Sequence, residues 1–188
     1  MRCIIVVTMI LLLTIISGYS TESIGYNHIK LGMSKSEFLK VFSRHYKGSF
    51  KINTIMMRLD KIVRGYWLIK KEPSPSIEFD IMVYMTEGLN GKVAKITINE
   101  RWYSEYSANR KFNNLLQILN RKYGEGTHSP NFKEPMKYVE WEIDKNKKII
   151  LQKDIYDFVK LVYTNTIYED RAVRYYLNKK KEIENQQY

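Results

Sequence analysis

The spacing of hydrophobic and polar residues changes several times along the chain, and each spacing predicts a type of element. Apolar side chains recur every three to four positions over residues 38–46, which predicts an amphipathic helix. Ser34 and Glu37 form an S-x-x-E capping box at its start, and Gly32 permits a tight turn just before it. We expect this helix to end near Gly48.

Two more helices are predicted further along the chain. Residues 107–124 carry an apolar stripe at helical spacing and stop at a glycine. Residues 168–183 begin with acidic residues and end with lysines, which matches the helix dipole. Residues 21–28 show no such pattern, and we expect them to form a short mobile leader.

The remaining segments read as strands and turns. Residues 77–85 alternate strictly between apolar and polar positions, which predicts a strand with one buried face. The Asn90-Gly91 pair that follows is a strong hairpin signal. Other predicted strands are two between Ile52 and Ile69 with a bulge or bend at Gly65, a return strand from about residue 93 to Trp102, and three at 138–143, 148–152 and 157–164.

This order of elements predicts an α+β fold. Consecutive hairpins with helices between them favour an antiparallel sheet with helices packed on one face. Helix-then-strands occurs twice, which suggests a pseudo-repeat within a single domain. We expect that domain to span residues 21–188 and to end in a basic helix.

The first twenty residues predict an export signal. Arg2 supplies a positive start, residues 3–16 form a nearly unbroken apolar run, and Gly18-Tyr19-Ser20 places small residues where a signal peptidase reads them. We therefore expect cleavage before Thr21 and a protein that ends in the periplasm or outside the cell. An uncleaved anchor is the alternative, although the run is shorter than the ~20 apolar residues that span a bilayer.

Cysteine and charge narrow the class of protein further. The one cysteine, Cys3, lies inside the predicted signal, so we expect no lipid anchor, disulfide or reactive thiolate. Export without disulfides favours the bacterial cell envelope. The net charge of +11 fits a solvated surface, and it also fits an anionic glycan or lipid as partner. Lys179, Lys180 and Lys181 are the candidate contacts for such a surface, and no nucleic acid is expected.

The stretch IKLGMSKSEFLKVF resembles the start of a known kind of exported module. Leu31, Gly32, Met33, Ser34 and Glu37 match the opening of the SmpA/OmlA-type outer-membrane assembly lipoproteins, and of the related β-lactamase-inhibitor-like domains. The resemblance covers residues 28–48. It implies helices on an antiparallel sheet and a function in binding proteins. This chain lacks the lipid-bearing cysteine of the lipoproteins and has one helix where those modules usually have two.

Signatures of catalysis and of cofactors are absent from the sequence. His28, His45 and His128 are far apart and have no metal-binding spacing. No nucleophile elbow, P-loop or dinucleotide fingerprint occurs. Glu78 and Asp80 share one strand face, as glycosidase chemistry might use, but solvated strand residues explain them as well. We therefore predict no enzyme, no metal and no cofactor, while a small hydrolase with sequence-distant residues stays open.

Aromatic residues next to arginines give the most positive signal. The segment NERWYSEYSANR (99–110) contains the candidate partner-binding residues Arg101, Trp102, Tyr103, Tyr106 and Arg110, of the types that protein interfaces use as anchors. Such rings could also stack on sugars or cap the core. Trp67 and Trp141, which lie in predicted strands, are assigned to the core.

The leading hypothesis is a non-enzymatic protein-binding module of the bacterial cell envelope. It would engage a protein partner through an exposed sheet face or through the 99–110 corner. The alternatives are a basic binder of anionic cell-wall glycan or lipid, and a small hydrolase.

Overall fold

The structure, a computed structural model, describes residues 24–56, 63–71, 76, 78–88, 90–129 and 136–185. The predicted signal peptide, residues 21–23 of the predicted leader, and Ile77 of the alternating strand lie outside the described residues.

The predicted helices and strands are present in the predicted order with small differences at their ends, and the structure adds three two-residue strands at 25–26, 29–30 and 127–128 that the sequence did not predict. In chain order they are β1 (Gly25–Tyr26), β2 (Ile29–Lys30), α2 (Lys35–His45), β3 (Phe50–Met56), β4 (Val63–Lys70), β5 (Glu78–Met85), β6 (Val93–Arg101), α3 (Glu105–Tyr123), β7 (Thr127–His128), β8 (Lys137–Asp144), β9 (Lys147–Lys153), β10 (Phe158–Asn165) and α4 (Thr166–Asn185).

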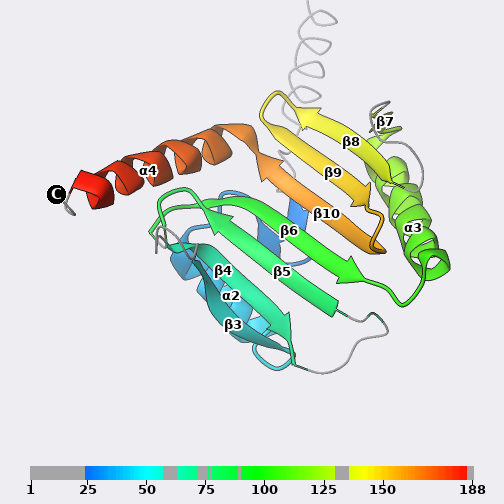
Figure 1. Cartoon of the computed structure of the whole chain (residues 1–188), viewed down its shortest axis with the longest axis horizontal. Helices are drawn as coiled ribbons and strands as arrows, with labels where there is room; N and C mark the ends of the chain where they lie inside the picture. The colour runs from blue at the N-terminus through cyan, green and yellow to red at the C-terminus, as the bar shows by residue number, and fades with distance from the viewer. Residues whose placement is uncertain are drawn as a thin grey trace, which may run out of the picture.

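One antiparallel sheet of eight strands dominates the fold, in the order β3-β4-β5-β6-β10-β9-β8-β7. The predicted α+β class is therefore confirmed. A helix followed by four strands occurs twice, as α2 with β3 to β6 and as α3 with β7 to β10. The two groups join where β6 pairs with β10, so the last strand of each group lies in the middle of the sheet (Figure 1).

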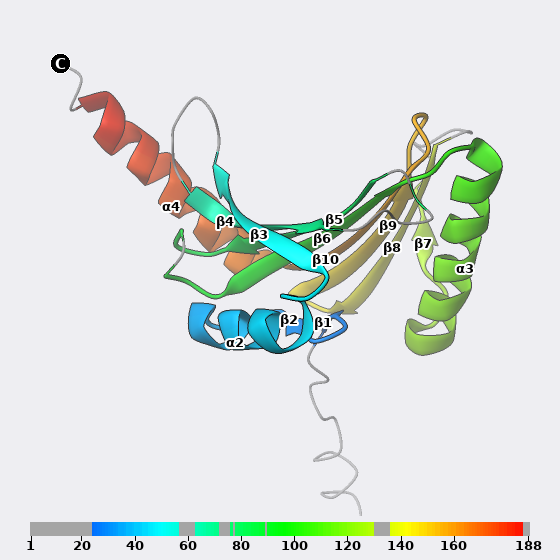
Figure 2. The same ribbon diagram turned by 90° about the horizontal axis from the view of Figure 1, so that it is seen from below.

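The hydrophobic core lies between the sheet and helices α2 and α3. Leu68, Ile81, Ile98, Leu161 and Leu151 are in register on five neighbouring strands, and all are buried. Figure 2 shows the sheet edge-on and curved, with α2 and α3 on its outer side. Alternate residues on each strand point to opposite faces, so every second residue of these strands points away from the two helices.

The described part of the predicted mobile leader, residues 24–28, is instead paired and packed into the fold. β1 pairs with β2 in a short hairpin that lies under the sheet beside α2 (Figure 2). Ile24 and Ile29 are buried in the core. Two isolated isoleucines within a short polar segment give no periodic signal, so the sequence pattern alone does not predict that they are buried.

The predicted capping box at the start of α2 is confirmed. The Ser34 hydroxyl accepts a hydrogen bond from the Glu37 N–H, and the Ser34 N–H donates to the Glu37 carboxylate at 2.7 Å. Gly32 has φ of 85°, a conformation that favours glycine. Its N–H donates to the Val93 carbonyl at 2.8 Å, which ties the segment before the helix to β6.

Helix α4 does not cover the core with α2 and α3. It contacts β6 and β10 at one end of the other sheet face. The Glu169 carboxylate accepts hydrogen bonds from Lys95 Nζ at 2.6 Å and from the Thr164 hydroxyl at 2.7 Å. The Tyr176 hydroxyl donates to the Met85 carbonyl at 2.7 Å. None of the helices in the described part of the chain is long and apolar enough to cross a bilayer.

Candidate functional site

The sheet face opposite α2 and α3, here called the open face, is turned toward the viewer in Figure 1. Helix α4 borders it at one end, while α2 passes behind the sheet in the same view. Figure 2 shows that this face is the concave side of the curved sheet. Apart from α4 at its end, no helix of the described part of the chain covers this concave face.

One row of side chains, the central row, crosses this face from edge to edge. Its middle consists of Trp67 on β4, Met82 on β5, Thr97 on β6, Val162 on β10 and Ile150 on β9, each paired with the next. Thr97 and Val162 are 3% and 5% exposed and form the floor. Trp67 is 36% exposed at one side. The row gives the open face an apolar centre about five strands wide.

The position of Trp67 corrects the sequence-based assignment of this residue to the core. Trp67 pairs with Met82 of the neighbouring strand and faces the open side of the sheet. The next residue, Leu68, is the one that faces the core. Trp141, by contrast, is 3% exposed, and its indole N–H donates to the Gly124 carbonyl at 2.9 Å, so its assignment to the core is confirmed. Of the two alternating sides of β4, the side of Leu68 faces the core and the side of Trp67 faces the open face.

Charged side chains surround the central row, and most of them are paired. Lys95 pairs with Glu169 at 2.6 Å, Lys148 with Glu140 at 2.7 Å, and Arg101 with Glu78 at 3.6 Å. Acids and bases are nearly balanced among the described residues of the face. By register they are Glu78, Asp80, Glu140 and Glu142 against Lys51, Lys95, Arg101, Lys148 and Lys160.

Tyr138, Glu140 and Lys148 form a hydrogen-bonded cluster on strands β8 and β9, on the side of the open face away from Trp67. The Tyr138 hydroxyl donates to Glu140 at 2.7 Å, and desolvation together with this bond raises the pKa of Tyr138 to about 12. The Lys148 ammonium beside Glu140 lowers the pKa of that carboxyl. Glu140 and Glu142 in turn raise the pKa of Lys148. Tyr138, Glu140 and Lys148 therefore keep their ordinary charge states at neutral pH.

The predicted 99–110 corner is only partly assembled by the fold. Trp102, Tyr106 and Arg110 line one shallow cavity of about 270 Å³, together with Lys111 and other residues of α3. The Lys111 ammonium lies 5.9 Å from the centre of the Trp102 ring and pairs with Glu100 at 3.0 Å. Three of the five predicted corner residues therefore lie together around this cavity.

Two of the predicted corner residues do not line the cavity. Arg101 is at the edge of the open face, where its guanidinium lies 5.4 Å from the centre of the Phe158 ring. Tyr103 is 72% exposed and is absent from the cavity wall. Adjacent positions at the end of a strand point in opposite directions, which is why Arg101 and Trp102 are separated.

The predicted cationic cluster near the C-terminus lies on α4. Lys179 pairs with Glu182 at 2.6 Å, and Lys180 pairs with Glu184 at 3.9 Å. Lys181 is exposed. Two of the three positive charges are thus partly compensated within the helix, which weakens the attraction of this cluster for an anionic surface.

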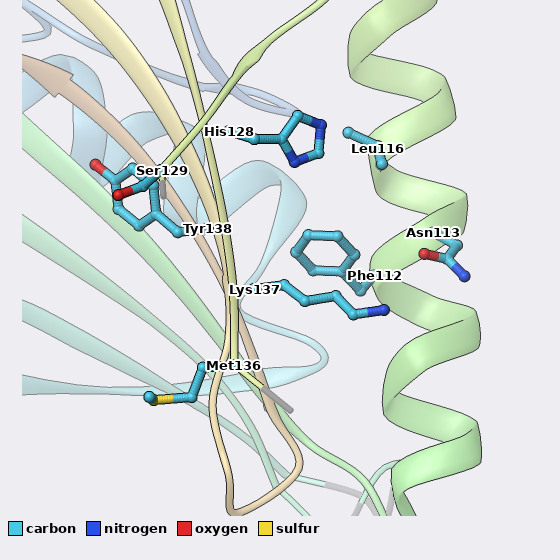
Figure 3. Close-up of a pocket in the computed structure, with 8 residues that line it drawn as sticks. All are labelled: Phe112, Asn113, Leu116, His128, Ser129, Met136, Lys137 and Tyr138. Atoms are coloured by element: carbon cyan, nitrogen blue, oxygen red, sulfur yellow. The ribbon is translucent and has the colours of Figure 1, made fainter. Parts of the chain in front are cut away.

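A groove of about 300 Å³ between α3 and the β7–β8 edge is lined by Ser129, His128, Lys137 and Tyr138 among other residues. Figure 3 shows that His128 and Lys137 extend toward α3, whereas Ser129 and Tyr138 lie on the opposite side of the strands. The serine and the histidine therefore do not form a dyad. Within the described ranges, no group of three or more His, Asp, Glu or Cys side chains is placed to hold a metal ion.

The fold brings together two histidines that are distant in sequence. The rings of His28, in the β1–β2 turn, and His45, at the end of α2, stack with centroids 3.7 Å apart and an interplanar angle of 12°. Desolvation lowers the pKa of His45 most, and the positive charges of His28 and Arg44 lower it further. Both rings are exposed, as expected for surface histidines.

This stack predicts a pH dependence of stability. Because the unfolded chain binds a proton at His45 near pH 6.5 and the folded chain binds it only at lower pH, the free energy of unfolding should fall as the pH is lowered through about 6.5. Urea unfolding of the wild type at pH 8 and pH 5.5 measures this fall. In His45→Gln the fall should be smaller, and an equal fall in both proteins would contradict the prediction.

Comparisons with known proteins give no further guidance. No protein-family model matches the chain, and searches of curated proteins and of solved structures found no significant match.

Proposed function

We propose that this protein is a non-enzymatic binding module of the bacterial cell envelope, exported after removal of residues 1–20, and that the open face of its sheet binds another protein. The observation that supports this most is the central row, a largely apolar strip of Trp67, Met82, Thr97, Val162 and Ile150 across five strands, in which Thr97 is the polar member. A tryptophan and a methionine in a surface row, with charged residues around them, match the usual composition of protein interfaces.

The charge of the face favours a protein over an anionic polymer. The chain carries a net charge of +11, yet acids and bases nearly balance on the open face, and most of them pair with each other. A surface that bound glycan phosphates or lipid headgroups would instead gather unpaired cations. The resemblance of residues 28–48 to modules that act by binding proteins points the same way.

The test is capture of the partner from envelope fractions by the immobilised protein. Ile150→Lys places a charge in the central row without touching the core, so capture should be lost while the protein stays folded. Ile118→Lys is the matched control, because Ile118 is 59% exposed on α3 and lies away from the open face. Capture by the wild type and by Ile118→Lys should persist at high salt, where the Debye length is only about 3 Å and attraction between exposed charges is screened.

Two results would reject this proposal. Retention that disappears at moderate salt would indicate the alternative, a basic binder of anionic glycan or lipid. Equal capture by wild type and Ile150→Lys would show that the open face is not the interface.

A further inference from the structure

Asp80 lies beside the central row of the open face and has unusual surroundings. It is on β5, with Ile69 of β4 and Asn99 of β6 as its paired neighbours. Its Oδ1 accepts a hydrogen bond from the Asn99 side-chain amide at 2.8 Å. The indole of Trp67 also donates to this carboxylate. Both donors are neutral, so the negative charge is solvated but not compensated.

Several partly buried carboxylates of the chain are compensated by a cation. Glu169 pairs with Lys95, Glu140 with Lys148, and Glu100 with Lys111. Asp80 has no such partner among the described residues, although it is half-buried. Desolvation raises the pKa of Asp80, the two hydrogen bonds act against this, and the nearby charge of Glu78 raises it further. A partly desolvated charge without a counter-ion costs free energy, and such groups mark functional sites.

Aromatic and apolar groups next to Asp80 complete a receptor for one kind of side chain. Trp67 is partly exposed, and its position on β4, opposite Met82 and diagonally next to Asp80, places the two side chains side by side on the open face. Cations bind over the face of a tryptophan ring, and the planar guanidinium of arginine also forms paired hydrogen bonds with a carboxylate. A neutral sugar could stack on Trp67 but would leave the charge of Asp80 uncompensated.

We infer that Asp80 and Trp67 together bind an arginine side chain presented by the partner protein. This inference rests on the proposed function, because it assigns the chemistry of the partner at the open face. The arginine would supply the counter-charge that Asp80 lacks within this chain, and its aliphatic stem would pack on Trp67.

The test uses Nα-acetyl-arginine methylamide as the probe, titrated into the isotopically labelled full chain and followed by NMR. The chain has three tryptophans, so the indole N–H signal of Trp67 can be assigned from the spectrum of Trp67→Phe. The probe should shift this signal saturably with a Kd on the order of millimolar. The lysine analogue should bind more weakly.

Asp80→Asn should raise the Kd of the probe at least tenfold, and the less similar Asp80→Ser is a second variant if Asp80→Asn does not fold. Asp144→Asn is the matched control, since Asp144 pairs with Lys147 in a turn between β8 and β9, and it should leave the Kd unchanged. No saturable shift up to about 50 mM probe, an equal Kd in Asp80→Asn, or a stronger shift with N-acetylglucosamine would overturn the inference.

The outcome can be separated from that of the proposed function. If Ile150→Lys abolishes capture of the partner and Asp80→Asn does not weaken it, the open face binds a protein and the arginine inference is wrong. If capture is indifferent to Ile150→Lys, the proposed function fails whatever the titration gives.

Discussion

Replacing Trp67 with alanine is expected to weaken binding of the captured partner by about 2 kcal/mol, roughly 30-fold in Kd. Trp67 is the large aromatic side chain at the side of the central row, and it is 36% exposed in the free protein. A partner that covered it would bury its remaining surface and complete its packing. The measurement is titration of the purified partner against wild type and Trp67→Ala by calorimetry.

Stability should change much less in this variant, by about 1 kcal/mol, because Trp67 packs on the surface and gives up one hydrogen bond to Asp80. Tyr106→Ala is the informative comparison, since Tyr106 is 76% exposed in the 99–110 corner. We expect it to leave the affinity unchanged. A large loss in Tyr106→Ala with none in Trp67→Ala would move the interface from the open face to the corner.

The largest loss of stability is expected for Phe112→Ala, at about 3–5 kcal/mol. Phe112 is 2% exposed and belongs to the cluster that joins α3 to the second half of the sheet. Removing its ring leaves a cavity that the rigid strands beneath it cannot fill. Since domains of this size are stable by only about 5–15 kcal/mol, the variant should show a clear shift of the urea midpoint.

Ile118→Ala tests whether the effect arises from burial. Ile118 is on the same helix and is 59% exposed, so its truncation should change the free energy of unfolding by less than about 0.5 kcal/mol. A loss below about 1 kcal/mol for Phe112→Ala would contradict the packing of α3 against the sheet.

The repeated order of elements explains why the open face exists. Each group of four strands is covered on one side by the helix that precedes it, α2 or α3. Because the groups meet at their last strands, β6 and β10, both helices lie on the same side and the sheet continues across the join. Eight strands are therefore covered on one face only, with α4 contacting the other face at its end.

Local sequence patterns determined most of the secondary structure of this protein. The capping box of Ser34 and Glu37 and the alternation from Phe79 to Met85 gave elements that the structure confirms. The hairpin predicted from Asn90-Gly91 is present as the β5–β6 pair, but its loop is longer than a two-residue turn, and neither Asn90 nor Gly91 has a positive φ. These signals involve only residues that are close in sequence. Hydrogen bonding at the helix end and the two-residue period of a strand are therefore enough to predict the elements.

The arrangement of the candidate site was decided by tertiary structure alone. The central row takes one residue from each of five strands, from Trp67 to Ile150, and the stacking of His28 on His45 joins a turn to a helix end. No local pattern encodes which strands become neighbours. A single-sequence period also leaves open which of two apolar phases faces the core, and this is why Trp67 was assigned to the wrong side of its strand.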